Sequence, residues 1–298
     1  MERKMTGLTF YKDYKNNEKL RKSFNELATL IFGINFEDWY QKGYWNNRYI
    51  PFSYTDGDKV IANVSVNLLE FVINGEKKRA IQIGTVMTHP DYRDRGLSAS
   101  LMNKVLEEYE NKYDFMYLFA NQSVLEFYPK FGFKPVKEYQ FSMEYSTSQN
   151  GVTGIRKLDG SNIDDLKFIY ELALERVPVS KRFGTDNTQG LLMFYCIYVF
   201  NNDIYYLEDE EAIVIFEQED GQVDIFDMVS KKAVNIDKIL SKISHYDINK
   251  IVFHYTPDYQ GIKTQRYIFN GDDVLFVKIS GNNEFPLFQV KHPLTSQA

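Results

Sequence analysis

The sequence predicts an α/β (α+β) fold with mostly antiparallel sheets, arranged as two lobes of similar element order. Three observations lead to this prediction. The chain has 298 residues, enough for two domains of roughly 100 to 200 residues each. Short alternating runs separated by Asp-Gly and Asn-Gly turns indicate antiparallel strands, with helical segments between them. The order of segments in residues 1–147 then recurs in residues 151–298.

The first half contains a meander enclosed by helices. Leu20, Phe24 and Leu27 recur at helical spacing, and Asn74-Gly75 is a strong signal for a tight hairpin. The expected elements are, in order, a strand at 8–14, helices at 17–32 and 36–44, strands at 51–55, 59–73 and 79–88, a helix at 97–111, a strand at 115–120, a short helix near 123–131, and closing strands over 133–145.

The second half follows after a polar stretch, Ser146 to Gly151, which is the expected linker. Leu166, Ile169 and Ala173 have the helical period. The expected elements are a strand at 154–158, a helix at 162–176, a meander at 204–207, 211–217 and 222–229, a helix at 236–244, a strand at 250–255 and a final strand at 273–279.

Composition excludes several classes of protein. The single cysteine, Cys196, rules out an internal disulfide framework, and its apolar surroundings favour a core residue over a covalent catalyst. No apolar run reaches the roughly 18 residues of a membrane span, and the N-terminus has no signal-peptide core. We therefore expect a cytoplasmic protein without membrane contact. A net charge of -6 argues against broad nucleic-acid binding.

The charge is concentrated in the second half. Residues 1–150 hold 20 basic and 19 acidic groups, net +1, which leaves 15 and 22, net -7, for residues 151–298. Such a body would attract a cationic partner. Solubility is the simpler explanation, and the sequence favours it.

One stretch, Thr85 to Met102, has the pattern of an anion-binding turn. A strand ends, a turn with Arg93 and Arg95 follows, and a helix begins after Gly96. Backbone N–H groups at a helix N-terminus lack partners and lie at the positive end of the helix dipole, so they bind phosphate. Glycine, followed by the small Ser98 and Ala99, permits a close approach.

These residues resemble the pyrophosphate loop of the GCN5-related N-acetyltransferases (GNAT), Arg/Gln-x-x-Gly-x-Gly/Ala. The pattern falls on Arg93, Gly96 and Ser98, with Ser98 where Gly or Ala is usual. A second segment, Asn121 to Phe133, is similar to the family's Asn-x-x-Ala-x-x-x-Tyr-x-x-x-Gly-Phe. Together the two motifs place the resemblance over roughly residues 8 to 145.

The resemblance implies direct transfer of an acetyl group from acetyl-CoA to a primary amine of a small molecule or peptide, with no metal. Tyr128 would be the general acid beside the sulfur, and Asn121 would hydrogen-bond the cosubstrate. The strand that ends at Val86-Met87-Thr88 would separate from its neighbour, and its free backbone groups would pair with the pantetheine arm. The loop from Arg93 to Ala99 would hold the pyrophosphate. The implied cosubstrate-binding residues are Val86, Met87, Thr88, Arg93, Asp94, Arg95, Gly96, Leu97, Ser98, Ala99 and Asn121.

No residue is an unambiguous general base. Many family members place a carboxylate where this chain has Gln82, and a neutral amide cannot accept the proton. Glu70 on the neighbouring strand is the substitute we consider, although an exposed acid is the simpler reading. Glu37 and Asp38 would either line the acceptor groove or be ordinary first-turn acids that the helix dipole favours. His89 stands before proline and reads as a turn residue. Backbone carbonyls and water stay open as alternatives.

Two further features bear on the acceptor side. Trp39 and Trp45 would form an aromatic wall for the acceptor, or pack the helix on the sheet, with equal support. The second half lacks the loop, since Ser230 to Asn235 has no Arg-x-x-Gly, and so resembles a degenerate GNAT-like lobe. Tandem lobes occur in Eis-like acetyltransferases, whose third, sterol-carrier-like domain does not fit in this length. A role borrowed from that domain does not carry over.

Two functions of different class follow from these patterns. One is an acetyl-CoA-dependent N-acetyltransferase that acts on an amine. If the acidic second half attracts the acceptor, that acceptor is a cation. The other is a non-catalytic acyl-CoA-binding sensor or scaffold. Gln82 favours the second, and Tyr128 with the intact loop favours the first more strongly. Neither a nucleic acid nor a membrane is an expected partner, and a homo-oligomer stays open.

Overall fold

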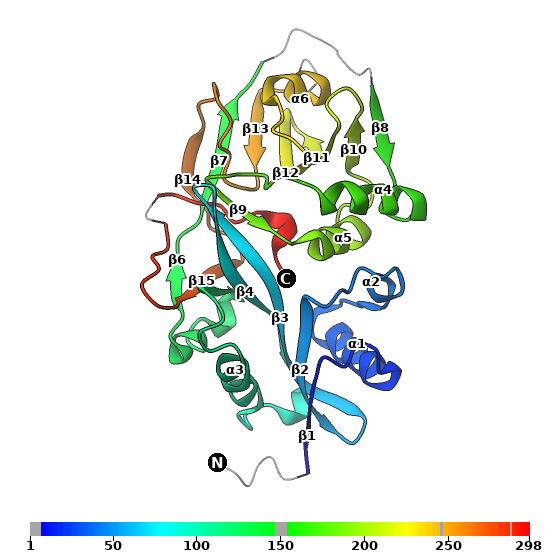
Figure 1. Cartoon of the computed structure of the whole chain (residues 1–298), viewed down its shortest axis with the longest axis vertical. Helices are drawn as coiled ribbons and strands as arrows, with labels where there is room; N and C mark the ends of the chain where they lie inside the picture. The colour runs from blue at the N-terminus through cyan, green and yellow to red at the C-terminus, as the bar shows by residue number, and fades with distance from the viewer. Residues whose placement is uncertain (1–6, 147–153, 245–246, 287) are drawn as a thin grey trace.

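The computed structural model describes residues 7–146, 154–244, 247–286 and 288–298 and contains two mixed sheets, one above the other in Figure 1. The α+β class predicted from the sequence is confirmed. The predicted linker lies outside the described residues except for Ser146. No helix of the described residues is long and apolar enough to span a membrane.

The first sheet has the strand order β1-β2-β3-β4-β5-β15-β6, and β9 pairs with β3. Only β4 and β5 run parallel, with α3 between them in the chain. The bounds are β1 Thr9–Lys12, β2 Tyr49–Asp56, β3 Lys59–Ile73, β4 Glu76–Thr88, β5 Phe115–Asn121, β6 Lys134–Val136, β9 Phe183–Asp186 and β15 Asp273–Ile279; the helices are α1 Glu18–Phe32, α2 Glu37–Gln41 and α3 Leu97–Glu108, with 3-10 turns η2 Pro90–Tyr92, η3 Gln122–Val124 and η4 Tyr128–Phe131.

The second sheet has the order β14-β7-β13-β12-β11-β10-β8. Its parallel pair is β12 and β13, with α6 between them. The bounds are β7 Tyr139–Glu144, β8 Ile155–Leu158, β10 Ile204–Leu207, β11 Ala212–Glu219, β12 Gln222–Ser230, β13 Lys250–Phe253 and β14 Gln265–Ile268; the helices are α4 Ile163–Leu174, α5 Gln189–Tyr198 and α6 Ile236–Ile243, with the 3-10 turn η5 Leu294–Ser296.

The two sheets repeat one order and exchange strands. In each, antiparallel strands lead to a parallel pair whose crossover contains a helix, and a strand from the other half of the chain follows. β15 from the second half lies beside β5, and β7 from the first half lies beside β13 (Figure 1). The predicted domains, 1–147 and 151–298, therefore each supply a strand to the other's sheet.

This exchange corrects two expectations. Of the closing strands predicted over 133–145, only β6 belongs to the first sheet, and the strand predicted at 273–279 is not the end of the second. Alternation of apolar residues marks a segment as a strand but does not name its neighbour. Helix α2 is also shorter than predicted, because Gly43 turns the chain at φ 83°.

Aromatic packing joins the two halves beside the first sheet. Asn17 begins α1 by accepting a hydrogen bond from the Leu20 N–H (3.3 Å), and the helix buries Leu20, Phe24 and Leu27. Phe24 packs against Trp45, and the same cluster includes buried residues of α5. Cys196 of α5 is fully buried in this cluster, as predicted for a core residue, and burial raises the pKa of its thiol.

Candidate active site

The site begins where β4 and β5 separate. Their parallel pairing covers only Ala80–Ile83 against Phe115–Leu118, although both strands continue. A bulge in β4 occurs at the same point, because Asn63 of β3 lies opposite Met87 while Ser65 lies opposite Gly84. Backbone groups on the facing edges of β4 and β5 are therefore left without a partner strand, as the family resemblance implied.

Thr85 at this bulge has a left-handed backbone, with φ 48°. A threonine there costs about 1 to 2 kcal/mol, so neighbouring contacts must hold it. The Tyr49 hydroxyl lies 2.6 Å from Thr85 Oγ1, and Asn63 Nδ2 donates to the Thr85 carbonyl (2.8 Å). The bulge is thus fixed from both β2 and β3.

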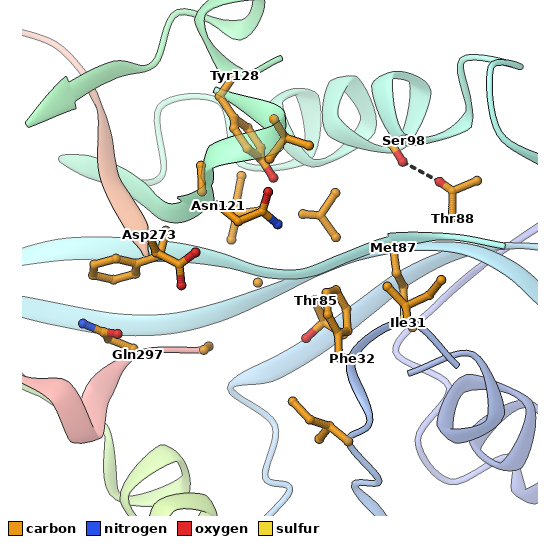
Figure 2. Close-up of a pocket in the computed structure, with 18 of the residues that line it drawn as sticks. Ile31, Phe32, Thr85, Met87, Thr88, Ser98, Asn121, Tyr128, Asp273 and Gln297 are labelled. Carbon is orange, nitrogen blue, oxygen red and sulfur yellow. Dashed lines mark hydrogen bonds between the residues drawn. The ribbon is translucent and has the colours of Figure 1, made fainter. Parts of the chain in front are cut away.

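A cavity of about 770 Å³ fills the opening between the strands (Figure 2). Seven of the cosubstrate-binding and catalytic residues proposed from the sequence line it: Val86, Met87, Thr88, Arg93, Ser98, Asn121 and Tyr128. The other members of the predicted loop do not. Leu97 is buried in the core, and Arg95 donates to the Asp91 carbonyl (2.7 Å) while its guanidinium lies over Tyr92.

The N-terminus of α3 closes one end of this cavity and is open to an anion. Gly96, the residue before the helix, has φ 76° and offers no side-chain acceptor to the first N–H groups. Ser98 Oγ lies 2.7 Å from Thr88 Oγ1, which joins the helix to β4 (Figure 2). At the equivalent end of α6, Asn235 Oδ1 already accepts from the Lys238 N–H (3.1 Å). Only the first of these two helix ends is left for a phosphate.

Tyr128 contributes a protonated hydroxyl to the cavity. It begins η4 with its side chain 5% exposed, and burial together with the charge of Asp273 raises its pKa to about 12. The ring packs near Phe133 and Phe276. In Figure 2 its oxygen points into the cavity toward Asn121. A phenol with this pKa remains a hydrogen-bond donor at neutral pH.

Asn121 ends β5 with one side of its amide occupied. Its Oδ1 accepts from the Ser123 N–H (3.0 Å) and the Ser123 hydroxyl (2.6 Å). This fixes the amide so that Nδ2 is directed into the cavity (Figure 2). The arrangement presents a donor at the end of the opening between β4 and β5.

Gln82, at the position of the usual carboxylate, has a structural partner instead. It is fully buried, and its surroundings assign the amide orientation: both amide groups find partners only when Nε2 donates to the Ser296 carbonyl and Oε1 accepts from the Ala298 N–H, both at 3.0 Å. An amide supplies both the donor and the acceptor that a backbone segment requires. Gly84 leaves space for the same segment, since a Cβ there would lie 3.0 Å from the Ala298 carbonyl group.

The other acids considered as a base lie away from the cavity. The Glu70 carboxylate accepts from Asn187 Nδ2 (3.0 Å) and lies 3.5 Å from Lys77 Nζ, on the edge where β3 pairs with β9. Two acids of α2 are paired with basic side chains, Glu37 with Arg21 (3.0 Å) and Asp38 with Lys42 (3.4 Å).

His89 is a turn residue, as expected. Its Nδ1 accepts from the Asp91 N–H (3.3 Å), and Lys59 Nζ lies 3.0 Å from its Nε2. His89 does not line the cavity.

The two tryptophans have different positions. Trp39 lines the cavity and donates from Nε1 to the Gly190 carbonyl of α5 (2.8 Å), whereas Trp45 stacks behind it at 5.7 Å. Both are nearly fully buried. Packing therefore accounts for Trp45, and Trp39 is both packed and part of the wall.

Part of the cavity wall carries no motif and was missed in the sequence. It comes from the second half of the chain: Leu191, Phe194, Tyr195, Asp273, Gln297 and Ala298. Three of these residues are in α5, within an apolar run that offered no clear period. Within the described ranges, no group of three or more His, Cys, Asp or Glu residues could hold a metal ion.

Comparison with known proteins agrees with this geometry. Residues 15–136 match the model of the family described as acetyltransferase (GNAT) domain. A search of curated proteins found no match.

Three solved structures share the fold at low identity. A probable N-acyltransferase from Enterococcus faecalis V583 has a TM-score of 0.60 at 15% identity, covering 92% of this chain and 72% of that one. A GCN5-related N-acetyltransferase from Kribbella flavida has a TM-score of 0.55 at 15% identity, covering 91% and 72%. Eis1 from Mycobacterium abscessus has a TM-score of 0.55 at 10% identity, covering 92% and 74%.

Proposed function

Because this chain belongs to the GNAT superfamily through residues 15–136, we propose that it transfers the acetyl group of acetyl-CoA directly to a primary amine of a small molecule or peptide. One observation carries the proposal. A single cavity extends from the uncapped N-terminus of α3, along the free edge of β4, to the hydroxyl of Tyr128. An anion site, an unpaired strand edge and a proton donor are thereby aligned.

The chain's residues fit the parts of acetyl-CoA in order. The first-turn N–H groups of α3 and the guanidinium of Arg93 hold the pyrophosphate by charge-assisted hydrogen bonds. The free edge of β4 from Val86 to Thr88 pairs with the amide groups of the pantetheine arm, and Asn121 Nδ2 donates to the same arm from β5. Acetyl-CoA supplies the thioester that carries the acetyl group.

Tyr128 acts as the general acid at the sulfur. Its pKa of about 12 keeps it protonated, so it donates as negative charge develops on the leaving thiolate. A bulged β4 also directs a backbone N–H toward the position of the acetyl carbonyl, where it stabilises the developing charge on oxygen. We do not assign the role of base to Glu70, because its contacts with Asn187 and Lys77 lie outside the cavity.

The scaffold alternative rests on Gln82 in place of the usual carboxylate, and the thiol-release test below decides between it and the transferase. A glutamine at position 82 suggested a site without a base, but here the Gln82 amide binds the segment that contains Ser296 and Ala298. These contacts give Gln82 a structural role that explains an amide at this position.

The test is release of free thiol from acetyl-CoA in the presence of a panel of primary amines and lysine peptides. We expect release that depends on both the protein and the amine, with the acetylated amine identified by mass spectrometry. Calorimetry with CoA measures binding separately. Binding of CoA without thiol release across the panel would refute the transferase and support the scaffold.

A further inference from the structure

The cavity has opposite charges at its two ends. Among the described residues that line it, the charged side chains are Arg93 and Asp273. Arg93 follows η2 in the turn before α3, at the phosphate end. Figure 2 shows Asp273 on the other side of the cavity from Ser98, which lies in the first turn of α3. An anion is thus favoured at one end and a cation at the other.

The backbone of Asp273 is fixed by strand pairing, although the residue is exposed. It begins β15, which pairs with β5 in seven consecutive positions from Asp273 opposite Asn121 to Ile279 opposite Phe115. In antiparallel strands, directly opposite residues project to the same face. Asp273 therefore lies beside Asn121, at the end of β5 and three residues beyond Leu118, the last residue that pairs with β4.

No described residue forms an ion pair or side-chain hydrogen bond with the Asp273 carboxylate. Nearly every other acid discussed for this site has a basic partner or an amide donor, as Glu37 and Glu70 do. The neighbours that influence Asp273 electrostatically are Asp272 and two tyrosines, Tyr128 and Tyr195. None of these groups neutralises the carboxylate.

The walls around this end are apolar and aromatic. Phe119 comes from β5 and Tyr195 with Phe194 from α5. A ligand that fits this end has an apolar body and one positive charge.

We propose that Asp273 binds the ammonium group of the acceptor and thereby selects primary aliphatic amines carried on an apolar or aromatic body. The inference rests on the function proposed above, which requires an amine but does not say how one is recognised. Aliphatic amines arrive protonated at neutral pH, so a carboxylate at the acceptor end captures them. The bound ammonium releases one proton to solvent before its nitrogen attacks. The C–N bond then forms as the C–S bond breaks, Tyr128 protonates the departing thiolate, and the second amine proton restores Tyr128 through solvent. The specificity residue thus comes from the second half of the chain.

The test compares a matched ligand pair on the full chain saturated with CoA. 2-Phenylethylamine is a cation at neutral pH, and 2-phenylethanol is its neutral counterpart of the same shape. We expect the wild type to bind the amine more tightly. Asp273→Asn should weaken amine binding about tenfold and leave the affinities for the alcohol and CoA within about twofold, because it removes one charge-assisted contact.

Asp272→Asn is the control. Asp272 is the adjacent exposed acid and does not line the cavity, so this variant makes the same change in net charge. It should keep the preference for the amine. Equal losses in Asp272→Asn and Asp273→Asn, an unchanged preference in Asp273→Asn, or no preference in the wild type would each overturn the inference.

Thiol release is measured in parallel, with 2-phenylethylamine and with O-benzylhydroxylamine, a primary amine that is uncharged at neutral pH. Asp273→Asn should lower kcat/KM about tenfold for the first and little for the second. Amine binding that depends on Asp273 without any thiol release would support the cation site and refute the proposed reaction. Thiol release that is unchanged in Asp273→Asn would support the proposed reaction and refute the cation site.

Discussion

At the scale of single residues, the environment of Tyr128 suits a proton donor more than a nucleophile. Its buried ring and the nearby charge of Asp273 both disfavour the phenolate, which explains the direction of its pKa. The hydroxyl nevertheless reaches the cavity (Figure 2). A buried tyrosine with an accessible oxygen is a group that donates without ionising in the resting site.

Replacement of Tyr128 by phenylalanine should lower kcat about 100-fold, the usual contribution of a general acid, while CoA affinity stays within about twofold. Thiol-release assays measure kcat, and calorimetry measures CoA affinity. The matched control is Tyr113→Phe, since Tyr113 belongs to the same core cluster but does not line the cavity. Equal kcat in wild type and Tyr128→Phe would remove Tyr128 from the mechanism.

His292 makes stability depend on pH. It is fully buried among aromatic rings, with Nδ1 donating to the Pro293 carbonyl (3.0 Å) and Nε2 accepting from the Tyr117 hydroxyl (3.1 Å). Burial, reinforced by Lys291, lowers its pKa to about 3. In the unfolded chain the His292 imidazole has a pKa near 6.5 and takes up a proton that the buried imidazole does not. The free energy of unfolding therefore falls as pH drops below about 6.5.

The expected loss is about 1 kcal/mol of unfolding free energy per pH unit between pH 6.5 and 5. Urea unfolding at pH 7.5 and 5.5 measures it, and His292→Phe, which keeps a ring in the cluster, should lose less over the same interval. Glu138 and Lys291 are present in both proteins, so their titration cancels in the comparison. The same loss in both proteins would show that His292 is not the source.

At the scale of elements, the start of α3 and the start of α6 differ in one respect that decides which can bind phosphate. Gly96 leaves the N–H groups of α3 uncapped, whereas the Asn235 side chain caps α6. The sequence indicated this difference through the missing Arg-x-x-Gly pattern, and the structure adds its physical cause.

Arg93→Gln should weaken CoA binding about tenfold, since it removes a charge-assisted contact at the phosphate end. Arg95→Gln is the control and should change affinity less than about threefold, because Arg95 donates to Asp91 and lies over Tyr92. Calorimetry at two salt concentrations provides the readout. A larger effect from Arg95 would mean that the loop presents the other guanidinium to the phosphates.

Local elements of the first half were predictable because their signals are local. The period of α1, the hairpin at Asn74-Gly75 and the loop before α3 all depend on residues near one another. Helix α5 was missed because it is apolar on most of its faces, so no 3.6-residue contrast marks it. The short strands β9 and β14 carry little pattern, with four residues each.

At the scale of the whole molecule, the site is built from both halves, and this could not be predicted from either. Asp273 lies next to Asn121 only because β15 crosses to the first sheet. Pairing across about 150 residues leaves no mark in local periodicity. Glu70 shows the converse, since a plausible position on β3 turned out to face β9 instead of the cavity.

A fragment of residues 1–147 should fail to fold cooperatively. It lacks β15, the neighbour of β5, and loses the buried Phe183, Leu275, Val277 and Val290 from the cluster beneath the first sheet. For the full chain we expect urea transitions followed by tryptophan fluorescence and by circular dichroism to coincide. A soluble fragment that unfolds cooperatively and binds CoA would contradict this expectation.

The reciprocal placement of β7 and β15 also limits how the gene can change. A recombination event that joined either half to a foreign sequence would leave one sheet short of a strand and expose an unpaired edge in each product. A mutation in β7 or β15 therefore affects the stability of the sheet that the other half of the chain mainly forms. The two halves must therefore be inherited together, and the acceptor specificity carried by one evolves under the stability requirements of both.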